Sequence, residues 1–143
     1  AMDAPVGAGA AISGTGRGYA VDPGAAGYVL VGDETAIPAI SQLMEAIPPP
    51  TPTQVHIEVA TAEAHLPMPV HPSATVEWHT LPAGIPPGGA LIDAVRRAEF
   101  DVAAKLWCAG EAAGMQAIRQ HLFKERGFPR SQATVRGYWR VRD

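Results

Sequence analysis

The order of short apolar runs and amphipathic segments predicts an α/β fold: an open, three-layer arrangement with a mostly parallel sheet and helices on both of its faces. The predicted order is strand, helix, strand, strand, helix, strand, helix, strand. Helices between strands require crossover connections, which make neighbouring strands parallel. Open parallel sheets bind ligands beyond the carboxyl ends of their strands, where the strand order switches.

Strands are predicted where apolar and β-branched residues gather in short runs bounded by turn residues. A buried run at Tyr28–Val31 is closed by Gly32, and a short strand is also expected near Tyr19–Val21. The remaining predicted strands are Gln54–Ala60, Thr75–Thr80, Ala103–Cys108 and Thr134–Arg140.

Helices are predicted at Ala36–Ile47, Ala90–Ala98 and Glu111–Glu125. The first has apolar residues with the i, i+3, i+4, i+7 spacing of one helical face, and three prolines from Pro48 onward end it. The last ends with basic residues and then Gly127, the residue type that favours the position just beyond a helix.

Composition limits the class of protein. The chain has 143 residues, 47% hydrophobic and 17% charged, which is typical of one globular domain. A net charge of −3 argues against nucleic-acid binding, although seven of the eleven basic residues lie between Arg119 and Arg142. No apolar run approaches the ~20 residues of a membrane span. A single cysteine, Cys108, excludes an internal disulfide and fits a cytoplasmic location.

Residues 1–18 are rich in alanine and glycine and are predicted to be a linker or loop, so that residues 19–143 form the folded domain. Cys108 ends a strand and is interpreted as a small buried hydrophobe rather than a nucleophile, because no spacing specifies a partner base. The five histidines are scattered, so no metal ligand and no catalytic residue is assigned.

Two turns at strand ends are the candidate site. Gly32-Asp33-Glu34-Thr35 and Gly110-Glu111 each lead directly into a helix. Two free helix N-termini facing one crevice are expected to bind the pyrophosphate of a dinucleotide. The Gly-x-Gly-x-x-Gly fingerprint is absent, and the two acids also suit helix capping. Nucleotide binding and an α/β domain with another role both stay open on these residues alone.

Three ordered motifs carry a family resemblance. The segments Tyr28–Ile40, Leu106–Met115 and Gly137–Arg140 resemble the siderophore-interacting protein family, and the likeness covers nearly the whole chain from Ser13 onward. It implies the ferredoxin-reductase-like fold, in which a flavin-binding barrel precedes a nicotinamide-binding α/β domain. Members of this family reduce ferric siderophores in the bacterial cytoplasm, which releases ferrous iron.

The resemblance implies that this chain is the NAD(P)H-binding half of such a reductase. Residues 1–18 would then link it to a missing flavin-binding domain, without which FAD is not held and the chain is inactive. The family often has a basic residue after the third strand, where this chain has Trp78-His79-Thr80-Leu81. His79 or Arg119 is the expected substitute, and the choice between NADPH and NADH stays open.

The resemblance also implies roles for single residues. Arg136 and Arg140, expected to share one face of the last strand, would recruit an anionic ferric siderophore. The alternative function is a nucleotide- or partner-binding module without redox activity. The expected cofactor-binding residues are Gly32, Asp33, Glu34, Thr35, Ala36, His79, Gly110, Glu111, Arg119, Tyr138 and Trp139.

Overall fold

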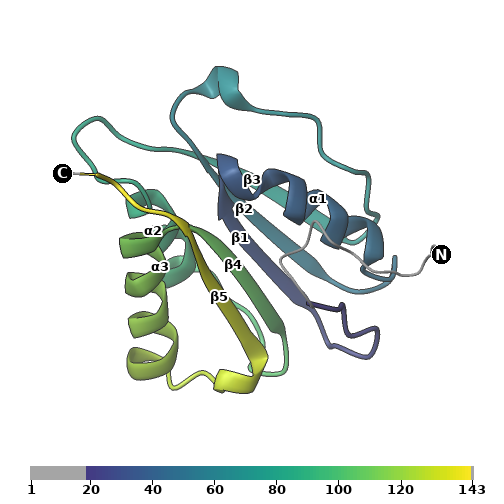
Figure 1. The fold of residues 1–143 in the computed structure, drawn as a ribbon. Helices are drawn as coiled ribbons and strands as arrows, with labels where there is room; N and C mark the ends of the chain where they lie inside the picture. The colour runs from purple at the N-terminus through teal and green to yellow at the C-terminus, as the bar shows by residue number, and fades with distance from the viewer. Residues whose placement is uncertain (1–18, 143) are drawn as a thin grey trace.

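A computed structural model describes residues 19–142, so the linker predicted for residues 1–18 lies outside the described residues. Its strands form one sheet in the order β3-β2-β1-β4-β5, and every neighbouring pair is parallel (Figure 1). The predicted α/β fold is confirmed. The strands are β1 (Tyr28–Asp33), β2 (Thr53–Val59), β3 (Ala74–Thr80), β4 (Lys105–Glu111) and β5 (Ala133–Trp139).

The helices cover both faces of the sheet, as predicted. Figure 1 shows α1 (Ile37–Ala46) on one face and α2 (Gly89–Arg97) with α3 (Ala112–Arg119) on the other. Among residues 19–142, no helix combines the length and apolar character that crossing a bilayer requires. Short helical segments complete the domain at Glu34–Ala36, Ala62–Ala64, Gln120–Glu125 and Arg130–Gln132.

Two apolar clusters hold the three layers together. Leu30 and Trp107 point to the α1 side and pack with Ile40, whereas Val31 and Cys108 point to the α2 and α3 side. Cys108 is fully buried, which confirms its interpretation as a small hydrophobe. Burial also raises the pKa of its thiol to about 12, so the reactive thiolate is scarce at neutral pH.

One local prediction is wrong, and a second is confirmed with a change of helix type. Tyr19–Val21 is not a strand. The Tyr19 hydroxyl instead donates to the Tyr28 hydroxyl at 3.2 Å, which holds this segment across the amino end of β1. The helix predicted for Glu111–Glu125 changes at Gln120 into a wider π-helix. There the Arg126 N–H donates to the His121 carbonyl, five residues earlier.

Two glycines bring the beginnings of α2 and α3 together. A Cβ added to Gly88 would lie 2.7 Å from the Gly114 Cα atom, and a Cβ added to Gly114 would lie 2.8 Å from the Gly88 Cα atom. Gly88 also has a φ of 93°, a conformation that other residues rarely adopt. Any larger side chain at either position would force the two helices apart at the carboxyl end of the sheet.

Candidate functional site at the carboxyl end of the sheet

The strand order switches between β1 and β4, and the two predicted turns meet there. Asp33 ends β1, and its Oδ2 atom accepts a hydrogen bond of 3.2 Å from the Glu111 N–H at the end of β4. The same oxygen accepts 2.8 Å from the indole Nε1 of Trp139, at the end of β5. One carboxylate therefore ties three strand ends together at the position where open parallel sheets bind ligands.

Asp33 also organises its own turn. Its Oδ1 atom accepts from both the backbone N–H and the hydroxyl of Thr35. Gly110 leaves room for this carboxylate, since a Cβ there would lie 2.8 Å from Asp33 Oδ2. Gly32 serves helix packing instead, because a Cβ there would lie 2.6 Å from the Cβ atom of Ala36.

Three glutamates at the same edge are also bound to backbone N–H groups. Glu34 accepts from Ala60 N–H at 2.8 Å and so joins the ends of β1 and β2. Glu111 accepts from Gly114 N–H at 2.9 Å and caps α3. Glu58, only 4% exposed, accepts from three N–H groups at the start of α2, those of Gly88, Ala90 and Leu91.

These contacts correct the expected anion site. The prediction required two free helix N-termini, but Glu111 already caps α3 and Asp33 caps the short helix that precedes α1. Each carboxylate supplies the negative charge that the positive end of a helix favours. The helix ends are therefore neutralised by the chain's own side chains.

Burial by itself would raise the pKa of the Glu111 carboxyl group. Hydrogen bonds from backbone N–H groups and the nearby Arg140 guanidinium outweigh this effect and hold the pKa below its usual value. The N–H groups are those of Gly114, Ala113 and Val141. This carboxyl group is thus ionised at neutral pH, which suits an acceptor that caps a helix. The same contacts place Arg140 beside the beginning of α3.

Two neighbouring hollows form what we call the carboxyl-end crevice. One has a volume of about 280 Å³ and the other about 710 Å³, and Pro87 lines both. Trp139 lines the smaller hollow and Arg140 the larger. The smaller is lined by Asp33, Glu34, Thr35, Glu58, Val59, Ala60, Leu81, Pro87 and Trp139, and the larger by Pro86, Pro87, Glu111, Ala112, Ala113, Arg140 and Val141.

The structure separates the two arginines expected to act together. Val135 packs into the cluster beneath α3, so its neighbour Arg136 points to the opposite face of β5. Arg140 follows the end of β5 and lines the hollow beside the start of α3. The β4–β5 ladder is irregular near Glu111, which breaks the alternation on which a shared face depended.

Tyr138 and Trp139 also differ in surroundings. Tyr138 packs edge-on against Trp107 on the α1 side, with ring centroids 6.2 Å apart. Trp139 lines the crevice and donates to Asp33. Both side chains are 38% exposed, so neither is buried.

His79 and Arg119 lie at opposite edges of the sheet. His79 is on β3, whereas Arg119 donates at 2.6 Å to the Val135 carbonyl of β5. Strands are spaced by about 4.8 Å, so the four steps from β3 to β5 separate these positions by about 19 Å. The two side chains therefore cannot contact the same phosphate group.

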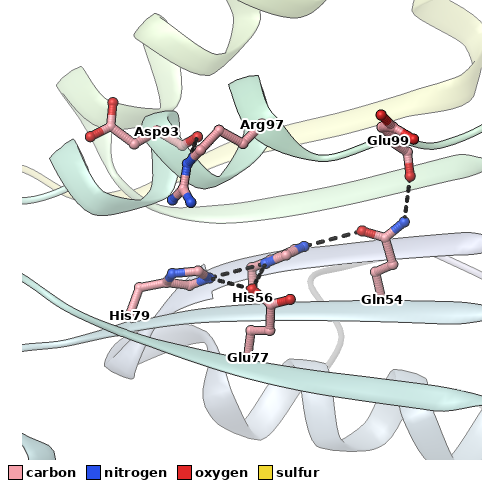
Figure 2. A network of polar contacts seen from close by, with 7 residues as sticks. All are labelled: Gln54, His56, Glu77, His79, Asp93, Arg97 and Glu99. Carbon is pink, nitrogen blue, oxygen red and sulfur yellow. Dashed lines mark hydrogen bonds and ion pairs between the residues drawn. The ribbon is translucent and has the colours of Figure 1, made fainter.

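A cluster that the sequence analysis missed lies on the α2 side of β2 and β3. The ring nitrogens His56 Nδ1 and His79 Nε2 are 3.0 Å apart, and Glu77 Oε1 lies within 3.8 Å of both (Figure 2). Desolvation by burial lowers the pKa of both imidazoles, so they are neutral at pH 7. The sequence does show Glu77 and His79 two residues apart, which places both on the same face of β3. Their position beside His56 of β2 depends on the pairing of the two strands, which only the fold provides.

The fold and the crevice define a parallel α/β domain of the kind that binds ligands at a switch in strand order. The model of the siderophore-interacting protein family matches residues 25–142, and the chain belongs to that family. Membership supports a role in siderophore utilisation.

Individual relatives agree with this assignment. An uncharacterized protein of Mycobacterium tuberculosis is 34% identical over 141 residues, which cover 90% of this chain and 50% of the relative. The mycobactin import ATP-binding/permease protein IrtA of the same species is 27% identical over 125 residues, 80% of this chain and 13% of that protein.

Solved structures of similar proteins share the fold. A siderophore utilization protein from T. fusca is 35% identical with a TM-score of 0.72, covering 84% of this chain and 47% of that one. The siderophore-interacting protein SipS from Aeromonas hydrophila is 25% identical with a TM-score of 0.70, covering 85% and 54%. The chain therefore spans about half the length of these solved relatives.

Proposed function

We propose that this chain is the NAD(P)H-binding half of a flavin-dependent ferric-siderophore reductase of the bacterial cytoplasm. The observation that carries the proposal is the family match over residues 25–142, combined with a crevice where the ends of β1 and β4 meet. In the complete reductase, NAD(P)H would supply the hydride, a flavin held by a separate domain would accept it, and the chelated Fe(III) would be reduced to Fe(II).

The crevice residues suggest how a dinucleotide would be held. Thr35 and Trp139 offer a hydroxyl and an aromatic surface, whereas the carboxylates of Asp33, Glu34 and Glu111 disfavour a phosphate beside them. Hydroxyl and carboxamide groups of the cofactor are better partners for these acceptors. Arg140 is the cation of the larger hollow and the better candidate for binding an anionic siderophore.

Titration of the isotope-labelled chain with NADPH and NADH, followed by NMR, tests nucleotide binding. We expect weak binding, with the largest shifts at the amides of Thr35, Ala60 and Glu111. Shifts centred on the loop Pro67–Pro72 would contradict the proposed site. The same chain, purified without added cofactor, should lack the flavin absorbance at about 450 nm.

The alternative is a binding module without redox activity, and the complete reductase distinguishes the two. Arg140→Ala should raise KM for an anionic ferric siderophore and leave hydride transfer from NADPH to flavin nearly unchanged, with an effect that shrinks as salt is raised. Stopped-flow measurement of both half-reactions checks this. Absence of any flavin reduction by NADPH or NADH would favour the binding module.

A further inference from the structure

The polar cluster on β2 and β3 contains three potential metal ligands that converge on one point. His56 Nδ1 lies 3.8 Å from Glu77 Oε1, and His79 Nε2 lies 3.7 Å from the same oxygen. With 3.0 Å between the two nitrogens, these atoms surround a position about 2 Å from each of them. Zinc–nitrogen and zinc–oxygen bonds have about this length, roughly 2.0–2.2 Å.

The register of two parallel strands creates this arrangement. His56 pairs with Glu77 across the β2–β3 ladder, and His79 lies two residues beyond Glu77 on the same face. The His56 side chain is 7% exposed and the His79 side chain 15%, whereas Glu77 is 64% exposed. Two imidazoles are therefore held by the sheet, and the carboxylate closes the site from the solvent side.

A chain of hydrogen bonds fixes the proton on His56. The backbone carbonyl of Glu99 can only accept, so the Gln54 atom 2.7 Å from it is the amide nitrogen. The other end of that side chain is then its Oε1 atom, 3.2 Å from His56 Nε2. Oε1 also only accepts, so His56 carries its proton on Nε2 and leaves the lone pair of Nδ1 directed at the cluster (Figure 2).

This hydrogen bond has the form that supports metal-binding histidines, in which the nitrogen away from the metal donates to a carbonyl or carboxylate oxygen. Without a metal ion, His79 Nε2–H donates to His56 Nδ1. With an ion between them, the His79 proton would sit on Nδ1 instead. That change is a shift between two neutral tautomers, so it needs no net proton release.

The surrounding charges are mixed. Arg97 extends from α2 toward the two imidazoles, and it lines the same hollow of about 300 Å³ (Figure 2). Its guanidinium opposes a cation, whereas Glu77 attracts one. Arg97 is exposed, and its Nε–H donates to the Asp93 carbonyl at 3.3 Å. The hollow would let a water molecule reach the fourth coordination position of a metal ion held by the two imidazoles and Glu77.

We propose that His56, Glu77 and His79 form a binding site for a divalent first-row transition-metal ion of the zinc class, with water as the fourth ligand. Two imidazoles, one carboxylate and water are a ligand set that zinc uses in proteins. The bound ion would fasten the edge strand β3 to β2. Metal binding here is independent of nucleotide binding at the carboxyl-end crevice.

Titration of the 143-residue chain with Zn²⁺ against a colorimetric chelator tests the site. We expect one Zn²⁺ per chain, binding tighter than Co²⁺ or Fe²⁺ added anaerobically, and no competition from Mg²⁺, which prefers oxygen ligands. Imidazole ¹⁵N spectra should show coordination through His56 Nδ1 and His79 Nε2. Wild-type chain that binds no Zn²⁺, or binds it through His71 or His121, would overturn the proposal.

Variants separate the ligands from their surroundings. Replacing His56 risks unfolding, so His79→Asn and Glu77→Gln are the primary variants, with folding checked by backbone NMR. His79→Asn should abolish stoichiometric binding, and Glu77→Gln should weaken it at least about tenfold. His65→Asn is the matched control, because His65 is exposed and stacks on Trp78, which lies on β3 between Glu77 and His79. Wild-type affinity in His79→Asn would refute the site.

Two further variants test the supporting contacts. Gln54→Ala frees the His56 tautomer and should weaken Zn²⁺ binding by about tenfold to a hundredfold. Arg97→Gln removes the opposing charge and should tighten binding several-fold, an effect that a non-specific surface site would not share. Equal affinity in wild type and both variants would show that the ion binds elsewhere.

Discussion

The carboxyl-end crevice and the His56–Glu77–His79 cluster are both polar, but their acceptors are used differently. In the crevice, the Asp33, Glu58 and Glu111 carboxylates each accept at least two hydrogen bonds, most of them from backbone N–H groups. In the cluster, two ring nitrogens face each other with one proton between them. The first arrangement holds strand and helix ends in place, and the second retains lone pairs that a metal ion can use.

An acidic residue on a strand of the sheet is therefore not by itself evidence of ligand chemistry. Glu58 and Glu77 make the point on neighbouring strands. Glu58 is 4% exposed and binds three N–H groups, whereas the Glu77 side chain is 64% exposed. Removing the first should damage the fold, and removing the second should not.

The largest effect is expected for Glu58→Ala. The change leaves the buried N–H groups of Gly88 and Leu91 without their acceptor, and it should lower the free energy of unfolding by about 3 kcal/mol. Urea denaturation measures this. Glu58→Gln, which keeps one acceptor oxygen, is the control and should cost less. A loss below about 1 kcal/mol in Glu58→Ala would mean that water replaces the carboxylate easily.

A smaller loss is expected for Trp139→Phe. Phenylalanine keeps an aromatic ring but cannot donate to Asp33 Oδ2, so the free energy of unfolding should fall by about 1 kcal/mol. Tyr138→Phe is the matched control on the adjacent residue, which is equally exposed, and it should leave stability nearly unchanged. Equal losses of unfolding free energy in the two variants would show that the indole–carboxylate hydrogen bond adds no stability of its own.

The next effect depends on pH. Because the pKa of Glu111 is lowered in the folded protein, its ionised form contributes stability above the ordinary glutamate pKa of 4.5. That contribution is lost as pH falls through the lowered pKa. Glu111→Gln should therefore reduce stability at pH 7 and flatten the decline of stability as pH falls below about 5. Urea midpoints across this range check the prediction, and parallel declines in both proteins would contradict it.

The smallest effect is expected for Glu77→Gln in buffer containing a metal chelator. Its exposed side chain should change the free energy of unfolding by no more than about 0.5 kcal/mol. Added Zn²⁺ should then stabilise the wild type more than the variant, because a ligand that binds the folded state stabilises it. Thermal unfolding with and without Zn²⁺ measures both. A large loss without metal would make Glu77 a structural residue.

Much of the fold could be predicted from local patterns. The apolar run at Tyr28–Val31 corresponds to β1, which is buried throughout, and the helical spacing after Pro38 corresponds to α1, because a helix buried on one face keeps that period in its sequence. Gly127 has a φ of 64°, as its place beyond the predicted helix required. Tyr19–Val21 was misjudged because its apolar residues pack against the core without pairing to a strand.

The candidate site could be predicted only in part. The turns after β1 and β4 were identified from their glycines and acids. The capping of α3 by Glu111 depended on the side chain folding back to accept a hydrogen bond from the Gly114 N–H. Glu58 carried no signal of its role, since its partners at Gly88 and Leu91 lie about thirty residues away. The separation of Arg136 from Arg140 depended on an irregular ladder that alternation does not foresee.

The sequence by itself determined the layers, the parallel sheet and the family, because hydrophobic period and ordered motifs are local properties of a chain. The tertiary structure alone decided which polar groups meet. Asp33 and Trp139 are separated by 106 residues, and His56 and His79 by 23, yet each pair is in hydrogen-bond contact. Strand order and register set these distances, and they arise from packing of the whole core rather than from any one segment.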